Sequence, residues 1–187
     1  SGKLILERVP FEPKNLINRI IHSYSYQTRD KALEIIYEPD FSIPNTLVGD
    51  PVRIAQILNN LISNAIKFTD KGFIKIILEL VNKESDHVNI RFTVKDSGIG
   101  VAPSKVDSIF DAFTQASSDT TRKYGGTGLG LAIVKKLTKL FGTEIHLESK
   151  LGEGSTFWFD IRFKVQQESM RKSKAKKVVK DDHLGDK

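Results

Sequence analysis

The sequence predicts a mixed α/β (α+β) fold, a two-layer sandwich with helices on one face of a mixed, largely antiparallel sheet. Two long segments, 51–69 and 129–141, place apolar residues at helical spacing with polar residues between them. Two other segments, 73–95 and 144–163, each contain a pair of strand-like runs joined by a polar turn. Amphipathic helices bury their apolar sides against one face of such a sheet.

The first part of the chain is expected to contain an extended lead-in, a helix and a short strand. Residues 2–9 are predicted to be extended or in a strand, and Pro13 begins a helical pattern that continues to about Thr28. Residues 33–37 form a short apolar run before Pro39, which predicts a strand.

The helix expected over residues 51–69 has the strongest signals in the chain. Asp50 is suited to cap its N-terminus, and Pro51 is suited to its first position. Residues spaced by three or four positions form one apolar face: Ile54, Ile57, Leu58, Leu61, Ala65 and Phe68. The helix is expected to end near Thr69, before a turn at Lys71 and Gly72.

The second half is expected to alternate strands, helices and one long loop. The predicted elements are strands 73–81 and 88–95, a short helix near 104–110, a polar loop over 115–126, a helix over 129–141 and strands 144–149 and 155–163. Gly142 would end the second long helix. A long polar loop inside a compact domain is typical of a functional or mobile segment.

Length and charge divide the chain into a lead-in (1–12), one domain (13–165) and a polar, lysine-rich tail (166–187). The net charge of +6 is concentrated at the end, where residues 164–187 contain eight basic and four acidic side chains. Such a tail is usually a solvated linker and only occasionally contacts nucleic acid or a membrane, so we expect no nucleic-acid partner. The chain has no cysteine and no long apolar run, and we expect it in the cytoplasm.

The first chemical motif is a polar stripe on the helix over 51–69. Asn60, Asn64 and Lys67 are spaced by four and three residues, so they lie along one side of the helix, at the edge of its apolar face. Two amides and an ammonium there could contact phosphate oxygens and a hydrated magnesium ion, which accepts few protein ligands. Taken alone, the stripe is also explained as a solvated polar face.

The second motif, Asp96-Ser-Gly-Ile-Gly100, follows directly after a predicted strand. A carboxylate at this place could accept a hydrogen bond from an exocyclic amine of a base, and glycines allow a flat ring to approach the backbone. A tight turn with a helix cap explains the same residues.

The third motif, Tyr124-Gly-Gly-Thr-Gly-Leu-Gly130, precedes a helix. Glycines at this position expose backbone N–H groups to an anion, and the helix dipole adds to the attraction. The motif is neither a Walker A loop nor a dinucleotide fingerprint, because it lacks the lysine of the first and the preceding strand of the second. Arg122 and Lys123 could reach phosphates from the adjoining loop, or could be solvated.

In this order, the motifs resemble the nucleotide-binding boxes of sensor histidine kinases. Asn60–Thr69 resembles the N box, Asp96–Gly100 the first glycine box and Ile109–Phe113 the phenylalanine box. Thr121–Leu131 is similar to the ATP lid with its second glycine box, and Gly152–Phe157 to the last glycine motif. The resemblance covers about residues 2–163 and implies the Bergerat-type ATP-binding fold of the gyrase and histidine kinase superfamily.

The resemblance implies a role for each matching residue. Asn64 would coordinate Mg²⁺, Asn60 and Lys67 would contact phosphate or the metal shell, and Asp96 would bind the amine of adenine. The remaining implied contacts are Phe68 against the nucleotide, Gly98 and Gly100 admitting the ring, Thr156 at the adenine end, Arg122, Lys123, Gly126, Thr127, Gly128, Leu129 and Gly130 around the phosphates, and Phe110 and Phe113 anchoring the lid.

The phosphate acceptor implied by the family is a histidine on a separate dimerisation domain, and none of the four histidines here has its sequence context. We therefore expect a catalytic domain that binds ATP without phosphorylating itself and behaves as a monomer. The implied partners are the dimerisation domain of the same protein and the receiver domain of a response regulator. The lysine-rich tail is compatible with a hybrid kinase, and membrane attachment of the parent protein is left open.

Two other functions share parts of this pattern. ATPases of the gyrase or mismatch-repair type carry glutamate as a general base where this chain has Asn60, and an amide cannot take a proton. Slow hydrolysis is therefore expected. A nucleotide-binding scaffold without phosphate transfer is the second alternative, and transfer to an added acceptor domain would separate it from a kinase.

Overall fold

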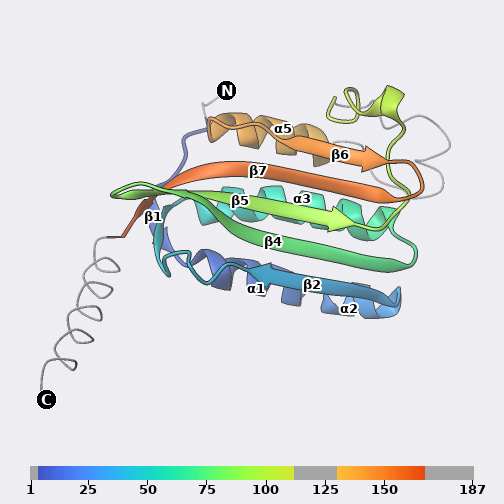
Figure 1. Cartoon of the computed structure of the whole chain (residues 1–187), viewed down its shortest axis with the longest axis horizontal. Helices are drawn as coiled ribbons and strands as arrows, with labels where there is room; N and C mark the ends of the chain where they lie inside the picture. Colours follow the sequence, from blue (N-terminus) through green and yellow to red (C-terminus); the bar gives the residue numbers. More distant parts are fainter. Residues whose placement is uncertain (1–3, 112–129, 167–187) are drawn as a thin grey trace, which may run out of the picture.

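The computed structural model describes residues 4–111 and 130–166, and these form a sheet covered by helices on one face (Figure 1). The helical elements are α1 (Pro13–Ser23), α2 (Ser25–Asp30), α3 (Pro51–Phe68), the 3₁₀ turn η1 (Pro103–Lys105) and α5 (Gly130–Leu140). The strands are β1 (Val9–Phe11), β2 (Leu33–Pro39), β3 (Leu47–Gly49), β4 (Gly72–Lys83), β5 (His87–Asp96), β6 (His146–Lys150) and β7 (Gly154–Val165).

The described strands form one seven-stranded sheet in the order β1-β3-β7-β5-β4-β2, with β6 also paired to β7. Strands β2 and β4 are parallel, and every other described pair is antiparallel. The expected mixed, largely antiparallel sheet with helices on one face is therefore confirmed.

The hydrophobic core lies between this sheet and helices α1, α3 and α5. Alternate residues of β5 and β7 point into it, and the rings of Phe92 and Phe159 stack with their centroids 5.0 Å apart. The apolar face of α3 is fully buried from Ile54 to Leu61. Burial of this face against the sheet fixes the rotation of α3, and so determines which of its polar residues face away from the core.

Helix α3 begins as expected from the sequence. The Oδ1 atom of Asp50 accepts the backbone N–H of Arg53 at 3.1 Å, and Pro51 occupies the first turn. The other carboxylate oxygen of Asp50 accepts the backbone N–H of Glu7 at 3.0 Å. One buried side chain therefore caps the helix and holds the lead-in segment beside it.

Several element boundaries differ from the prediction. The helix expected over residues 13–28 is interrupted at Tyr24, which separates α1 from α2. Of the lead-in, only residues 9–11 form a strand, and the short strand β3 was not predicted. The helix expected near 104–110 is reduced to η1 followed by turns.

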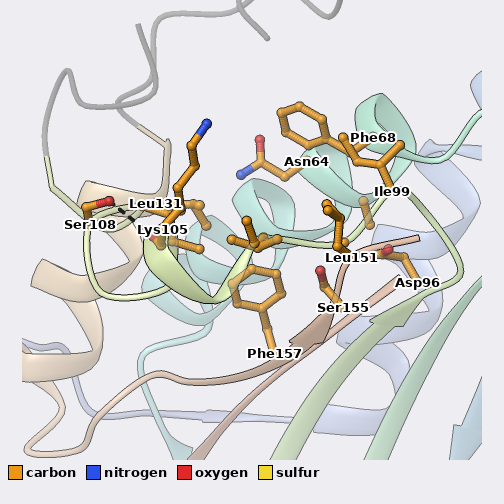
Figure 2. A pocket seen from close by; sticks show the side chains of 15 residues that line it. Asn64, Phe68, Asp96, Ile99, Lys105, Ser108, Leu131, Leu151, Ser155 and Phe157 are labelled. Atoms are coloured by element: carbon orange, nitrogen blue, oxygen red, sulfur yellow. Dashed lines mark hydrogen bonds between the residues drawn. The ribbon is translucent and has the colours of Figure 1, made fainter. Parts of the chain in front are cut away.

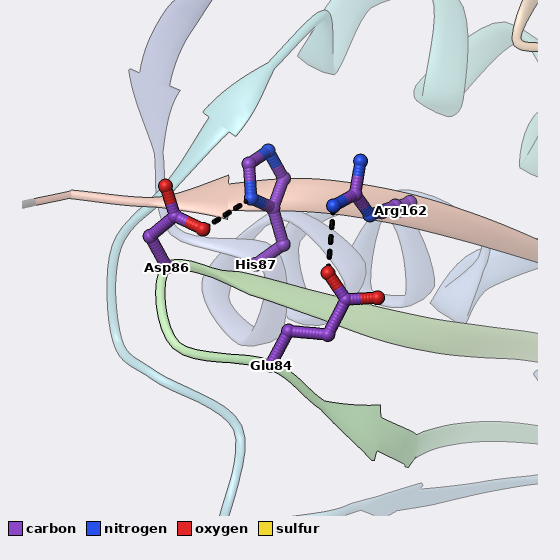
Figure 3. A network of polar contacts seen from close by, with 4 residues as sticks. All are labelled: Glu84, Asp86, His87 and Arg162. Carbon is purple, nitrogen blue, oxygen red and sulfur yellow. Dashed lines mark hydrogen bonds and ion pairs between the residues drawn. The ribbon is translucent and has the colours of Figure 1, made fainter.

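The end of the sheet that carries the β4–β5 hairpin is held by two polar contacts (Figure 3). The Arg162 guanidinium contacts the Glu84 carboxylate at 2.6 Å, and His87 Nδ1 lies 2.7 Å from Asp86 Oδ1. The contact with His87 lowers the pKa of Asp86. The contact between Arg162 and Glu84 joins the hairpin to β7 at the end of the sheet opposite Asp96, whereas the contact between His87 and the preceding residue Asp86 lies within the hairpin.

Among the helices that the structure describes, none combines the length and the apolar composition that a membrane span requires. The loop expected over 115–126 lies outside the described residues, as does the tail from 167 onward.

Candidate functional site

A cavity of about 330 Å³ opens between α3, the segment that follows β5, the start of α5 and the β6–β7 turn (Figure 2). It contains residues from each of the predicted motifs that the structure describes. Its lining consists of Asn64, Ala65, Phe68, Asp96, Ile99, Gly100, Val101, Ala102, Lys105, Ser108, Ile109, Leu131, Leu151, Ser155 and Phe157.

Helix α3 contributes two of the predicted site residues to the cavity. Asn64 and Phe68 are one helical turn apart, and both line it. Asn60 does not line the cavity, and its Nδ2 atom donates to the carbonyl of Gln56 at 3.0 Å. Its Oδ1 atom faces the start of α5, 3.1 Å from the position that a Cβ on Gly130 would occupy. Lys67 is also outside the lining.

Asp96 is the most deeply buried ionisable group of the cavity lining, with 6% of its surface exposed. It ends β5, and its Oδ1 atom accepts the backbone N–H of Gly98 at 2.9 Å. Burial raises the pKa of Asp96, while hydrogen bonds from the backbone of Gly98 and Ser155 act in the opposite direction. The site thus holds a poorly solvated carboxylate that could accept a hydrogen bond from a ligand.

Gly98 and Gly100, the two glycines that follow Asp96, are required because other backbone segments pass close to them. A Cβ on Gly98 would lie 2.7 Å from Thr69 Oγ1 and 2.9 Å from Asp96 Oδ1, and would collide with the carbonyl of Phe68. Gly100 has a φ of +70°, and a Cβ there would collide with the carbonyl of Lys150. We expected these glycines to admit a flat ring, but their first effect is to let three chain segments meet beside Asp96.

The β6–β7 turn is joined to the segment after β5. The N–H of Gly152 donates to the carbonyl of Ile99, and the N–H of Val101 donates to Ser149 Oγ, both at 2.7 Å. Ile99 and Leu151 line the cavity yet remain 37% and 63% exposed. Exposed apolar side chains at the mouth of a cavity favour a ligand with an apolar surface.

Ser155, rather than Thr156, faces the cavity from β7. Side chains alternate along a strand, and the buried Phe157, Phe159 and Ile161 place Ser155 on the inner face and Thr156 on the outer one. Ser155 is paired with Asp96 in the sheet, and its Oγ lies 2.8 Å from Ser149 Oγ. Thr156, predicted at the adenine end, does not line the cavity. The alternation of apolar residues from 157 onward contained the signal for Ser155.

Sequence reasoning also missed Lys105, which lines the cavity from η1. A lysine in a polar segment has no distinguishing pattern. Phe110 packs edge-to-face on Phe157 with their centroids 6.0 Å apart, so it supports the cavity wall from outside the lining. The predicted contacts that lie outside the described residues are Phe113, Arg122, Lys123, Gly126, Thr127, Gly128 and Leu129.

The described residues contain no cluster of three or more histidine, cysteine, aspartate or glutamate side chains that could hold a metal ion. Asn64 offers an amide oxygen to the cavity. A hard cation such as Mg²⁺ accepts such a ligand when other ligands, phosphate oxygens among them, complete its shell. The site therefore fits a metal ion that Asn64 contacts from the protein and that is coordinated mainly by oxygens of a bound molecule.

Comparison with known proteins identifies the family. A model of the histidine kinase-, DNA gyrase B- and HSP90-like ATPases matches residues 49–165, which contain all the described cavity residues. The chain belongs to this family. Proteins named as histidine kinases are among those similar in sequence. The signal transduction histidine-protein kinase BarA of Escherichia coli K12 is 39% identical over 161 residues, which are 86% of this chain and 18% of BarA.

Hybrid signal transduction histidine kinase K of Dictyostelium discoideum is 44% identical over 85% of this chain and 14% of that protein. The chain thus spans less than a fifth of the length of these relatives.

Solved structures with the same fold as this chain include histidine kinase structures. Full-length ShkA in complex with AMPPNP matches 89% of this chain with a TM-score of 0.76 and 31% identity, over 33% of ShkA. The catalytic domain of histidine kinase ThkA matches 86% of this chain and 99% of its own length, with a TM-score of 0.66 and 28% identity.

Proposed function

We propose that this chain is the catalytic domain of a two-component sensor histidine kinase. It binds ATP with Mg²⁺ and donates the γ-phosphate to a histidine on a dimerisation domain outside the chain. The observation that carries the proposal is the cavity in which the buried Asp96 carboxylate and the Asn64 amide face the same space. The family of the chain and an AMPPNP complex of a similar protein support a nucleotide as the ligand.

The adenine end of ATP is assigned to Asp96. Its carboxylate accepts a hydrogen bond from the exocyclic amine, and Ser155 lies beside it as a second polar group. Apolar side chains, including Phe68, Ile99 and Leu151, line the cavity around them. A purine without an amine at this position could not donate to Asp96 and would leave a buried carboxylate unpaired. The contact therefore selects adenine over such a purine.

Asn64 is the residue of the described chain that would hold Mg²⁺. The ion would neutralise negative charge on the phosphates. Asn60 and Lys67 are proposed near the phosphates, although neither lines the cavity. The remaining phosphate contacts are assigned to Arg122, Lys123 and the backbone of residues 126–130, of which only Gly130 is described.

The reaction transfers the γ-phosphoryl group to an imidazole nitrogen of the acceptor. The bond from that nitrogen to phosphorus forms as the bond from phosphorus to the ADP oxygen breaks, and ADP leaves. Catalysis of this kind relies on positioning and charge neutralisation. Asn60 cannot take a proton from water, so hydrolysis of ATP is expected to be slow.

The proposed partners follow from the same assignment. They are the histidine-containing dimerisation domain and a receiver domain, and some of the similar proteins are named hybrid kinases. We propose residues 13–165 as the catalytic domain, residues 1–12 as its connection to the dimerisation domain, and residues 166–187 as a basic tail or linker. The isolated chain is proposed to be a monomer in the cytoplasm.

Transfer to an added acceptor tests this function. The chain would be incubated with ATP labelled in the γ-phosphate and a purified dimerisation domain from a related hybrid kinase. We expect acid-labile label on the acceptor, no label on this chain alone, and no transfer by Asp96→Ala. Rapid release of free phosphate without labelling of any acceptor would instead indicate an ATPase.

A further inference from the structure

The cavity has two chemically different ends (Figure 2). Asp96 and Ser155 lie at one end, and Lys105 and Ser108 lie at the other, with the Asn64 amide above the space between them. Most of the remaining lining is apolar, including Ala65, Ile109 and Phe157. A ligand that fits this arrangement has a hydrogen-bond donor at one end and negative charge at the other.

Lys105 is the one cationic side chain in the part of the cavity lining that the structure describes. It is exposed and makes no ion pair with any residue among 4–111 and 130–166. Figure 2 shows its ammonium extending to the same side of the cavity as the Asn64 amide. Lys67, the cation predicted for this role, does not line the cavity.

The backbone of Lys105 is held in place although its side chain is exposed. Its carbonyl accepts the N–H groups of Ser108 and Ile109 and the Ser108 hydroxyl, each at 3.1 Å, and its own N–H donates to Ala102 at 2.9 Å. Ile109 is buried in the core. The anchored backbone fixes where the side chain starts, and its four methylenes let the ammonium follow a phosphate.

We propose that Lys105 contacts the phosphates of the bound nucleotide and so orients the ligand, with adenine at Asp96 and phosphates at η1. This inference rests on the proposed function. A lysine ammonium binds phosphate as a point charge, and the charge-assisted contact is stronger than a neutral hydrogen bond. Lys105 is then a determinant of phosphate affinity that makes no contact with the base.

The test compares ligands that differ only in their phosphates. Binding of AMPPNP with Mg²⁺ would be measured by calorimetry, and binding of adenosine by chemical-shift perturbation. The variants are Lys105→Gln, Lys105→Arg and the control Lys83→Gln. Lys83 ends β4 far from Asp96, so its substitution removes the same charge at a distant place.

We expect Lys105→Gln to weaken AMPPNP binding roughly tenfold, with adenosine binding unchanged. Lys105→Arg should keep most of the affinity, and Lys83→Gln all of it. If Lys105→Gln loses the same affinity for adenosine as for AMPPNP, or loses no more affinity for AMPPNP than Lys83→Gln does, the proposed role of Lys105 is overturned. The proposed function would be unaffected by that result. A folded wild type that binds neither ligand would overturn the proposed function as well.

Discussion

The Asp96 carboxylate accepts the backbone N–H of Gly98 at 2.9 Å. A Cβ on Gly98 would lie 2.9 Å from the same carboxylate oxygen, so any side chain there would displace Asp96. We therefore predict that Gly98→Ala destabilises the domain by about 1–3 kcal/mol through overpacking and abolishes nucleotide binding. Urea unfolding and calorimetric titration measure the two effects.

Gly152→Ala is the matched control for this substitution. Gly152 has a φ of +83°, but a Cβ there would meet nothing within 4 Å. Only backbone strain of roughly 1 kcal/mol is expected, with affinity unchanged. Equal effects of the two variants on affinity would show that any glycine substitution disturbs the site, and that Gly98 has no special relation to Asp96.

The pH dependence of stability should reveal the burial of Asp96. Its folded-state pKa is raised above the ordinary value of 3.8, so the ionised carboxylate disfavours folding at neutral pH. This cost is complete above the folded-state pKa and disappears as the pH falls through it toward 3.8. Asp96→Asn should therefore be at least as stable as wild type at pH 7.

Thermal unfolding across this pH range measures the difference. The advantage of Asp96→Asn over wild type should shrink as the pH falls. An advantage that grows toward low pH would mean that the folded state lowers the pKa of Asp96, contrary to its burial.

Two neighbouring hydroxyls of β7 should differ in their effect on binding. Ser155→Ala removes a hydroxyl from the cavity lining and is expected to weaken AMPPNP binding by roughly 1 kcal/mol. Thr156→Val changes the outer face of the sheet and should leave affinity unchanged. If only Thr156→Val weakens binding in the same titration, the register of β7 beside the site is different in solution.

Asp50 joins the start of α3 to the lead-in through one carboxylate. Asp50→Ala loses both the helix cap and the bond from Glu7, for an expected cost of about 2 kcal/mol. Asp50→Ser keeps a capping hydroxyl but is too short to hold both partners, so about half of that loss is expected. The free energy of unfolding in denaturant measures both variants. If Asp50→Ala and Asp50→Ser lose the same amount, the whole effect belongs to the bond with Glu7.

Much of the fold was predictable because local and global signals agree. The Asp50-Pro51 start and the apolar face from Ile54 onward predicted α3 and its orientation, which place Asn64 and Phe68 at the site. The break at Tyr24 was not predictable, because helical spacing continues through it. Strand β3 has only three residues, and its pairing with β1 and β7 depends on tertiary structure.

The site itself was predicted only in part. Asp96 and the glycines beside it carry a local pattern, but Lys105 reaches the cavity through the path of the chain after β5, which no periodicity describes. Asn60 shares a helical stripe with Asn64 yet turns toward Gln56 and Gly130, since helical spacing defines a side and not a side-chain direction.

The most direct test of the central claim is a calorimetric titration of this chain with an ATP analogue, with and without Mg²⁺. Wild type would be compared with Asp96→Ala and Asn64→Ala. We predict binding that Mg²⁺ strengthens, that Asp96→Ala abolishes and that depends less on Mg²⁺ in Asn64→Ala. Absence of binding by a folded wild type, or full affinity in Asp96→Ala, would contradict the assignment of this cavity to ATP.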